Sequence, residues 1–77
     1  MSKQKTEAVR FVWESAFSTP ISEPSLTRLG GWVQAWGDLP VSRAIERAAL
    51  MNRTTPEAEA IETIRLTLSN WKRRGWL

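Results

Sequence analysis

Residues 54–77 read TTPEAEAIETIRLTLSNWKRRGWL, a stretch that carries both a start signal and a stop signal for one long helix. Thr55 can cap the free amide groups, and Pro56 suits the first helical position, where no amide hydrogen is needed. Large apolar residues then recur at steps of three and four, on one side of a helix: Ile61, Ile64, Leu68 and Trp71. Gly75 is placed to end the helix. The stretch therefore predicts a helix over residues 55–74 with a core-facing side.

The charges of this predicted helix are divided by sign along its length. Glu57, Glu59 and Glu62 lie toward the amino-terminal end, where the helix dipole is positive. From residue 65 onward the stretch has no acidic residue, only these basic ones: Arg65, Lys72, Arg73 and Arg74. We therefore expect the helix to present a cationic tip to a partner.

Proline and glycine divide the rest of the chain into three further helical segments. The first stops before Pro20, because the residue before a proline avoids the helical region. Ser22 can cap the second segment. Gly37 can close it in the left-handed conformation, Asp38 can cap the third segment, and Pro40 lies just inside that segment. No segment shows the two-residue alternation of a strand.

The apolar residues of these three segments also follow helical spacing, and they form a candidate core: Val9, Val12, Trp13, Ala16, Phe17, Leu26, Leu29, Val33, Trp36, Val41, Ile45, Ala48 and Ala49. Residues 1–6 are polar, and we expect a loose tail there, as at most chain ends. The sequence thus predicts one all-α domain over residues 1–77. It is a compact bundle of about four short helices, over residues 6–17, 22–37, 40–52 and 55–74.

Gly30 and Gly31 stand in the middle of the second predicted helix. Each costs about 0.8–1 kcal/mol there relative to alanine, so the pair needs a reason. Close approach of a neighbouring helix, or a local bend, is favoured over a phosphate-binding loop. No strand precedes the pair and no glycine-rich fingerprint surrounds it.

The composition argues against several classes of protein. The 77 residues include no Cys and no His, so a disulfide scaffold, a thiolate metal site and an imidazole base are all missing. The carboxylates are spread along solvated faces, and a serine nucleophile would lack its base. We therefore expect no enzyme activity, no bound metal and no cofactor.

Charge and hydropathy set expectations for the environment of the chain. The formal net charge of +3, with a pI near 10.2, permits a polyanionic partner without demanding one. No apolar run approaches the roughly 20 residues that span a bilayer, and no apolar segment follows the basic start as in a secretory signal. We expect a cytoplasmic protein with no membrane span, either one small domain or a part of a longer chain.

The order of several features along the chain is similar to that of a known family. These features are Phe17, then Pro20 to Ser22, Leu29 and Trp32, an alanine-rich run from Ala44 and Ile45, and residues 64–75. In this order they resemble the DnaD-type domain, the carboxy-terminal helical domain of bacterial and phage primosome proteins. The resemblance spans roughly residues 9–76.

The last helix carries the closest part of this resemblance and also its departures. The family has Tyr, then Ile four residues on, then Trp four further, followed by basic residues and often Gly. Trp71 and Gly75 match that pattern, as do the basic residues between them. Thr63 stands in place of the tyrosine and Thr67 in place of the isoleucine, so a stacking platform for DNA is lost.

The resemblance implies a role in starting DNA replication. Members of the family bind DNA through this region, self-associate and take part in loading the replicative helicase. It therefore implies DNA, single-stranded or duplex and without sequence specificity, as a partner. A helicase or its loader and a second copy of the chain are the other partners that it implies.

The residues themselves also favour a nucleic-acid site at the carboxy-terminal tip. The candidate DNA-binding residues are Arg65, Trp71, Lys72, Arg73, Arg74 and Trp76. Cations bind phosphates, and exposed indoles stack on unpaired bases at roughly 1–3 kcal/mol each. Two explanations without DNA binding stay open. Cations in the last turn of a helix also interact favourably with the helix dipole. Trp71 lies on the apolar side of its helix, so it can belong to the core.

Two alternatives to a DNA-binding domain stay open. One is a helical protein-interaction module of a larger protein, without direct DNA contact. The other, weaker alternative is a helix-turn-helix DNA-binding protein. The start of its second helix would be acidic, although that is where such proteins contact the bases.

The salt dependence of DNA affinity distinguishes a DNA-binding domain from the protein-interaction module. Neutralising about three phosphates gives a log–log slope near −2, so a fourfold rise in salt weakens single-strand binding roughly sixteenfold.

Overall fold

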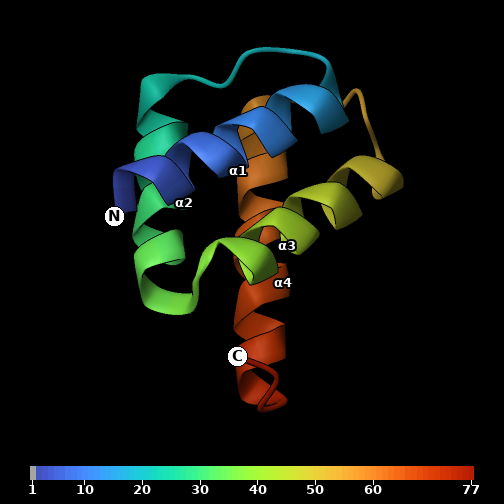
Figure 1. Cartoon of the computed structure of the whole chain (residues 1–77). Coiled ribbons are helices and arrows are strands. Elements are labelled where there is room, and N and C mark those ends of the chain that lie inside the picture. The colour runs from blue at the N-terminus through green and yellow to red at the C-terminus, as the bar shows by residue number, and fades with distance from the viewer. Residues whose placement is uncertain (1) are drawn as a thin grey trace.

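Four helices form, because each segment carries one apolar side that only the other helices can cover (Figure 1). The computed structural model describes the backbone of residues 2–77 and the side chains of residues 6–77. The helices are α1 (Ser2–Phe17), α2 (Glu23–Trp36), α3 (Asp38–Met51) and α4 (Glu57–Arg73). No strand occurs among the described residues, and the predicted all-α bundle is confirmed.

The helices pack crosswise. In Figure 1, α1 and α3 lie side by side and run across α2 and α4. The radius of gyration is 11.2 Å, close to the ~11.5 Å expected for a globular domain of this length. α4 is the longest helix, and its C-terminal end reaches past the other three (Figure 1).

The core is entirely apolar among the described side chains, with no buried polar or charged residue. Its buried members come from all four helices and the loop before α2: Val9, Trp13, Phe17, Ile21, Leu26, Leu29, Val33, Val41, Ala44, Ile45, Ala48, Ala49, Ala60, Ile61, Ile64 and Leu68. The predicted core residues Val12, Ala16 and Trp36 are only half-buried, as are Trp32 and Trp71, and all five pack against this core.

The helix stops follow the predicted signals. α1 ends at Phe17, shortly before Pro20. Gly37 ends α2 with a φ of 95°, so the positive φ is as expected. Its ψ of 164° lies outside the left-handed helical region, however, because the chain extends at this corner and α3 begins at the next residue.

Three predicted caps are wrong. Ser22 holds the N-cap position of α2, but its side chain does not cap the helix and instead donates a hydrogen bond to Glu57. Asp38 is the first helical residue of α3, because Gly37 serves as the N-cap directly after α2. Thr55 lies one residue too early, since α4 begins at Glu57 with Pro56 as its N-cap.

The expectation of a loose tail over residues 1–6 is wrong for the described part, because α1 begins at Ser2. Met1 lies outside the described residues. No Gly or Pro stands between Ser2 and Thr6, and Lys and Gln have good helix propensity. Once a helix has nucleated, each further residue adds one hydrogen bond, so α1 continues through this polar stretch.

The structure explains one of the two adjacent glycines of α2. A Cβ atom built on Gly30 would lie 3.3 Å from Oγ1 of Thr6, so Gly30 lets α1 approach α2 closely. The predicted close approach is confirmed for Gly30. A Cβ on Gly31 would meet nothing within 4 Å, and nothing in the structure explains a glycine there.

Candidate nucleic-acid interface

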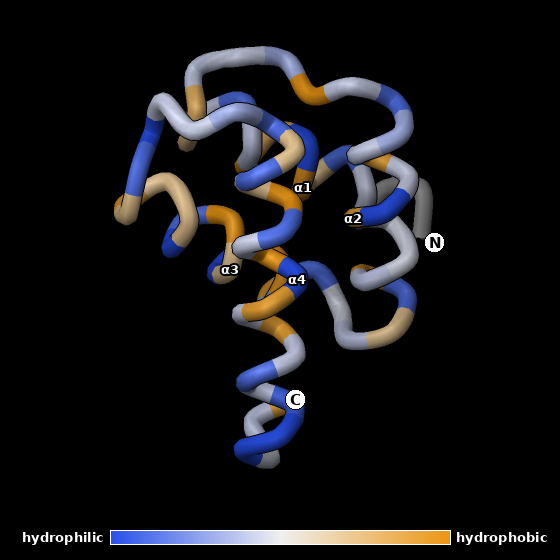
Figure 2. The backbone as a smooth tube through the Cα atoms, turned by 180° about the vertical axis from the view of Figure 1, so that it is seen from behind, coloured by the Kyte–Doolittle hydropathy of each residue, from blue (hydrophilic) through white to orange (hydrophobic). Residues whose placement is uncertain are grey.

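The C-terminal end of α4 is a cationic tip. Lys72, Arg73 and Arg74 are all exposed there, and Lys72 and Arg73 form the basic last turn of the helix. Figure 2 shows this end as a hydrophilic segment that follows the apolar middle of α4. Beyond Trp71 none of the other described helices covers α4, so its last basic residues are exposed to solvent.

A Schellman motif ends α4 and folds the chain back at the tip. Gly75 has a φ of 78°, its amide donates to the carbonyl of Lys72 at 3.0 Å, and the Trp76 amide donates to the carbonyl of Trp71 at 2.9 Å. The predicted stop at Gly75 is confirmed. The motif returns Trp76 toward the helix, where the guanidinium of Arg74 lies 5.3 Å from its ring centroid.

Both C-terminal indoles line an open groove between the tip of α4 and residues 39–47 of α3, which we call the tip groove. Its lining residues are Leu39, Pro40, Arg43, Arg47, Trp71, Trp76 and Leu77. Trp71 is half-buried and packs against the core, whereas Trp76 is 64% exposed. Trp71 therefore serves the core and the groove at once, while Trp76 offers most of its ring to a partner.

Arg43 and Arg47 are the residues that the sequence analysis missed. They are exposed and four positions apart on α3, so they share one face of that helix. Their spacing in the sequence predicts that they lie on the same face of α3, but it does not predict that this face lies beside Trp71 and Trp76. Only the packing of α3 against α4 brings these two arginines beside the indoles.

The basic residues of the tip and the groove have no carboxylate partner. Among the described side chains the ion pairs join Arg10 to Glu7 and Glu23, and Arg65 to Glu62. The cations outside these pairs at this end of the molecule are Arg43, Arg47, Lys72, Arg73 and Arg74. This end therefore carries five basic side chains with no carboxylate within ion-pair distance among the described residues.

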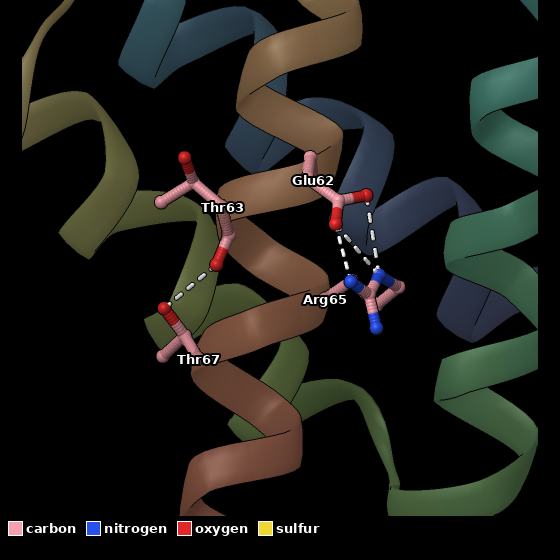
Figure 3. A network of polar contacts seen from close by, with 4 residues as sticks. All are labelled: Glu62, Thr63, Arg65 and Thr67. Carbon is pink, nitrogen blue, oxygen red and sulfur yellow. Dashed lines mark hydrogen bonds and ion pairs between the residues drawn. The ribbon is translucent and has the colours of Figure 1, made fainter.

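Arg65 does not belong to this group. Its guanidinium pairs with the carboxylate of Glu62 one turn earlier, and its Nε lies 3.1 Å from Oε2 (Figure 3). The hydrogen bond from Arg65 lowers the pKa of Glu62, and the same bond raises the pKa of Arg65. Figure 3 shows this pair on the opposite side of α4 from Thr63 and Thr67. Of the six predicted site residues, Trp71 and Trp76 line the tip groove and Arg74 lies over Trp76. Lys72 and Arg73 are exposed at the same end of α4, and Arg65 is set apart with Glu62.

The two threonines that depart from the family pattern are half-buried on the α3 side of α4. The hydroxyl of Thr67 donates to the carbonyl of Thr63 at 2.8 Å, within the helix (Figure 3). Both line a second hollow beside the tip groove, together with Arg47, Leu66 and Trp71. Small side chains here leave open a space that larger ones would fill.

A different, apolar groove lies between α1 and α3, and we call it the α1–α3 groove. Phe11, Leu50 and Met51 line it and are 71%, 87% and 68% exposed. Glu46 and Arg53 line the same groove, so its charges are of both signs.

No group of three or more His, Cys, Asp or Glu side chains within residues 6–77 is placed to hold a metal ion. None of the described helices is long and apolar enough to cross a membrane. Comparison with protein-family models, with curated proteins and with solved structures finds no match for this chain.

Proposed function

We propose that this chain is a DNA-binding domain that grips phosphates with the cationic tip of α4. The observation that carries the proposal is a group of exposed cations without carboxylate partners, at the end of the molecule that also carries two indoles. Lys72, Arg73 and Arg74 have no carboxylate partner among the described side chains. Of the three, Arg74 lies over the ring of Trp76, which lines the tip groove together with Trp71. Unpaired cations bind phosphates by releasing counterions, and exposed indoles accept bases.

The helix dipole alone is a weaker account of these charges. It favours Lys72 and Arg73 at the end of α4, by about 0.3–1 kcal/mol each. It gives no reason for Arg43 and Arg47, which lie in the second and third turns of α3. Arg43 and Arg47 line the tip groove, and Lys72 to Arg74 are exposed at the end of α4 beside it. Two helices thus supply cations to the same end of the molecule, and a shared anionic partner accounts for both.

The biological setting in this proposal rests on the resemblance to the DnaD-type domain. By that resemblance the chain belongs to a bacterial or phage primosome protein, associates with copies of itself and helps to load the replicative helicase. The confirmed all-α bundle supports this setting, and so does the run from Trp71 to Gly75 at the end of α4.

A salt titration of single-stranded DNA binding tests the proposal. The three cations of the tip predict a log–log slope near −2. Replacing Arg73 and Arg74 by Ala (the tip variant) is expected to reduce the slope by about 1.4. Replacing Arg28 and Arg53 by Gln (the control variant) removes the same charge elsewhere and leaves the slope unchanged. The DNA proposal fails if the protein does not bind at low salt, or if the tip variant binds like the wild type.

A protein-interaction module is the second candidate function, and the α1–α3 groove favours it. Exposed apolar side chains gather there at Phe11, Leu50 and Met51, and such patches mark protein contacts more often than chance surface. Light scattering of the purified chain over a range of concentrations tests whether a second copy covers this groove. Changing Phe11 and Leu50 to Ser should then lower the measured mass, while DNA binding through the tip is retained.

A further inference from the structure

The tip groove continues along α3 and α4 into the second hollow, and together they form one track. Arg47 and Trp71 line both hollows, so the two hollows adjoin. The track runs from Leu39 and Trp76 at the tip to Met51 and Thr63 near the other end of α3. In Figure 1, α3 crosses α4 above the C-terminal end of α4, where the tip begins.

The track has a cationic wall and an apolar floor. Arg43 and Arg47 stand on the α3 wall, and no acidic residue is among the described residues that line either hollow. Trp71, which is half-buried and packs against the core, forms the floor, and Leu66, which is 54% exposed, lies beside it. A surface with one sign of charge beside apolar and aromatic side chains suits a ligand with a charged backbone and flat apolar groups.

The geometry points to a single strand of nucleic acid, lying along the α3–α4 track with its phosphates at Arg43 and Arg47 and its bases against Trp71 and Trp76. This inference rests on the proposed function and adds the form of the nucleic acid and two residues that bind it. Residues four apart on a helix have Cβ atoms about 5–6 Å apart, so the two arginines face one strand in succession.

A single strand suits the track better than a duplex does. The bases of a duplex are stacked and paired inside it, and its phosphates are what meet a protein surface first. The indole of Trp71 is recessed between α3 and α4, so only an unstacked base can reach it. A duplex can therefore touch the exposed tip, but it leaves the floor of the track empty.

The α1–α3 groove provides a contrast within the same molecule. Glu46 and Arg53 both line that groove, so it offers no surplus of positive charge. The track carries cations alone among its described lining residues. A polyanion is therefore selected by the track and not by the other groove.

The test compares a 15-nucleotide oligo(dT) with a 15-base-pair duplex by fluorescence anisotropy at several salt concentrations. The track variant replaces Arg43 and Arg47 by Gln, and the control variant, R28Q with R53Q, removes the same charge away from the track. Two additional phosphate contacts steepen the wild-type slope for oligo(dT) from about −2 to about −3.5. The track variant is expected to return the slope to about −2 and to weaken oligo(dT) binding roughly 25-fold at 0.1 M salt.

The outcomes separate this inference from the proposed function. Oligo(dT) binding that is weakened in the track variant, with duplex binding unchanged, supports both. If the tip variant weakens binding and the track variant behaves like the control, the inference is overturned while DNA binding by the tip stands. Equal losses for oligo(dT) and duplex in the track variant also overturn it, because the arginines then serve both forms. Absence of binding to either oligonucleotide at low salt overturns both.

Discussion

Arg10 links two helices, since its guanidinium lies 3.4 Å from Glu7 on α1 and 3.5 Å from Glu23 on α2. Exposed ion pairs of this kind contribute only about 0–1 kcal/mol to the free energy of unfolding, so they add little to the stability of the fold. Arg43 and Arg47 have no such pair among the described side chains. Their positive charge is therefore available to a ligand.

Only part of the role of Glu57 is predicted from the sequence. It lies in the first turn of α4, as expected, but its carboxylate also accepts hydrogen bonds from the start of α2. The hydroxyls of Ser22 and Ser25 donate to it, and the Ser22 amide donates at 3.0 Å. Burial opposes ionisation of Glu57, but these hydrogen bonds together outweigh burial and lower its pKa below 4.5.

The lowered pKa predicts how Glu57 contributes to stability as pH changes. Because the folded state holds the carboxylate ionised, its contribution is present above the ordinary pKa of 4.5 and is lost as pH falls through the lower folded value. Changing Glu57 to Gln should cost about 1 kcal/mol at pH 7, and the difference from wild type should shrink below pH 4.5. Urea unfolding at pH 7, 5 and 3 measures both effects.

Glu59→Gln is the matched control for this prediction. Glu59 is exposed in the same first turn of α4, so its change removes the same charge from the helix dipole without breaking the bonds to α2. A loss in E59Q equal to that in E57Q would show that the dipole, and not the link between helices, sets the stability difference.

Where a helix begins and ends depends both on the residues at that position and on its tertiary neighbours. Gly75 ends α4 as predicted, because a residue without Cβ adopts positive φ at little cost. The failed cap at Ser22 has a different origin. A serine or threonine hydroxyl at a helix start has more than one possible acceptor or donor, and tertiary neighbours decide which one it uses.

Substitution by Ala is expected to change the free energy of unfolding differently at the two adjacent glycines of α2. Gly31→Ala is expected to stabilise the protein by about 0.8–1 kcal/mol, because a Cβ there meets open space. Gly30→Ala is expected to gain less or to lose stability, because its Cβ would press on Thr6 of α1. Thermal unfolding followed by circular dichroism measures the pair, and about 1 kcal/mol corresponds to a shift of roughly 4–8 °C. An equal gain at both positions would contradict the close approach of α1 and α2.

The whole molecule depends on a small core. A domain of this size rarely has more than roughly 3–5 kcal/mol of net stability, while sixteen apolar residues are buried in its described part. Each large buried side chain therefore carries a sizeable share of the free energy of folding. Truncating any one of them also leaves a cavity, which adds to the loss of stability.

Leu68→Ala is expected to unfold a large fraction of the molecules. Leu68 is fully buried, and a buried Leu→Ala change costs about 2–5 kcal/mol, which is close to the total stability of a domain this small. Leu50→Ala is the control, because Leu50 is 87% exposed and surface changes stay within about 0.5 kcal/mol. Far-ultraviolet circular dichroism at 25 °C compares the two. Retention of full helicity in L68A through a normal melting transition would contradict the assigned core.

The sequence by itself determined the all-α class, the four segments and most of the core, because helical spacing is a local property that Gly and Pro interrupt at recognisable places. It also indicated the cationic tip, since Lys72 to Arg74 follow one another directly. Arg65 and Glu62 are three residues apart on α4, so their pairing is also a local contact. Only the tertiary structure decided that Arg43 and Arg47 join Trp71 and Trp76. That grouping depends on which face of α3 meets α4, and this is a contact between residues far apart in the chain that no local pattern encodes.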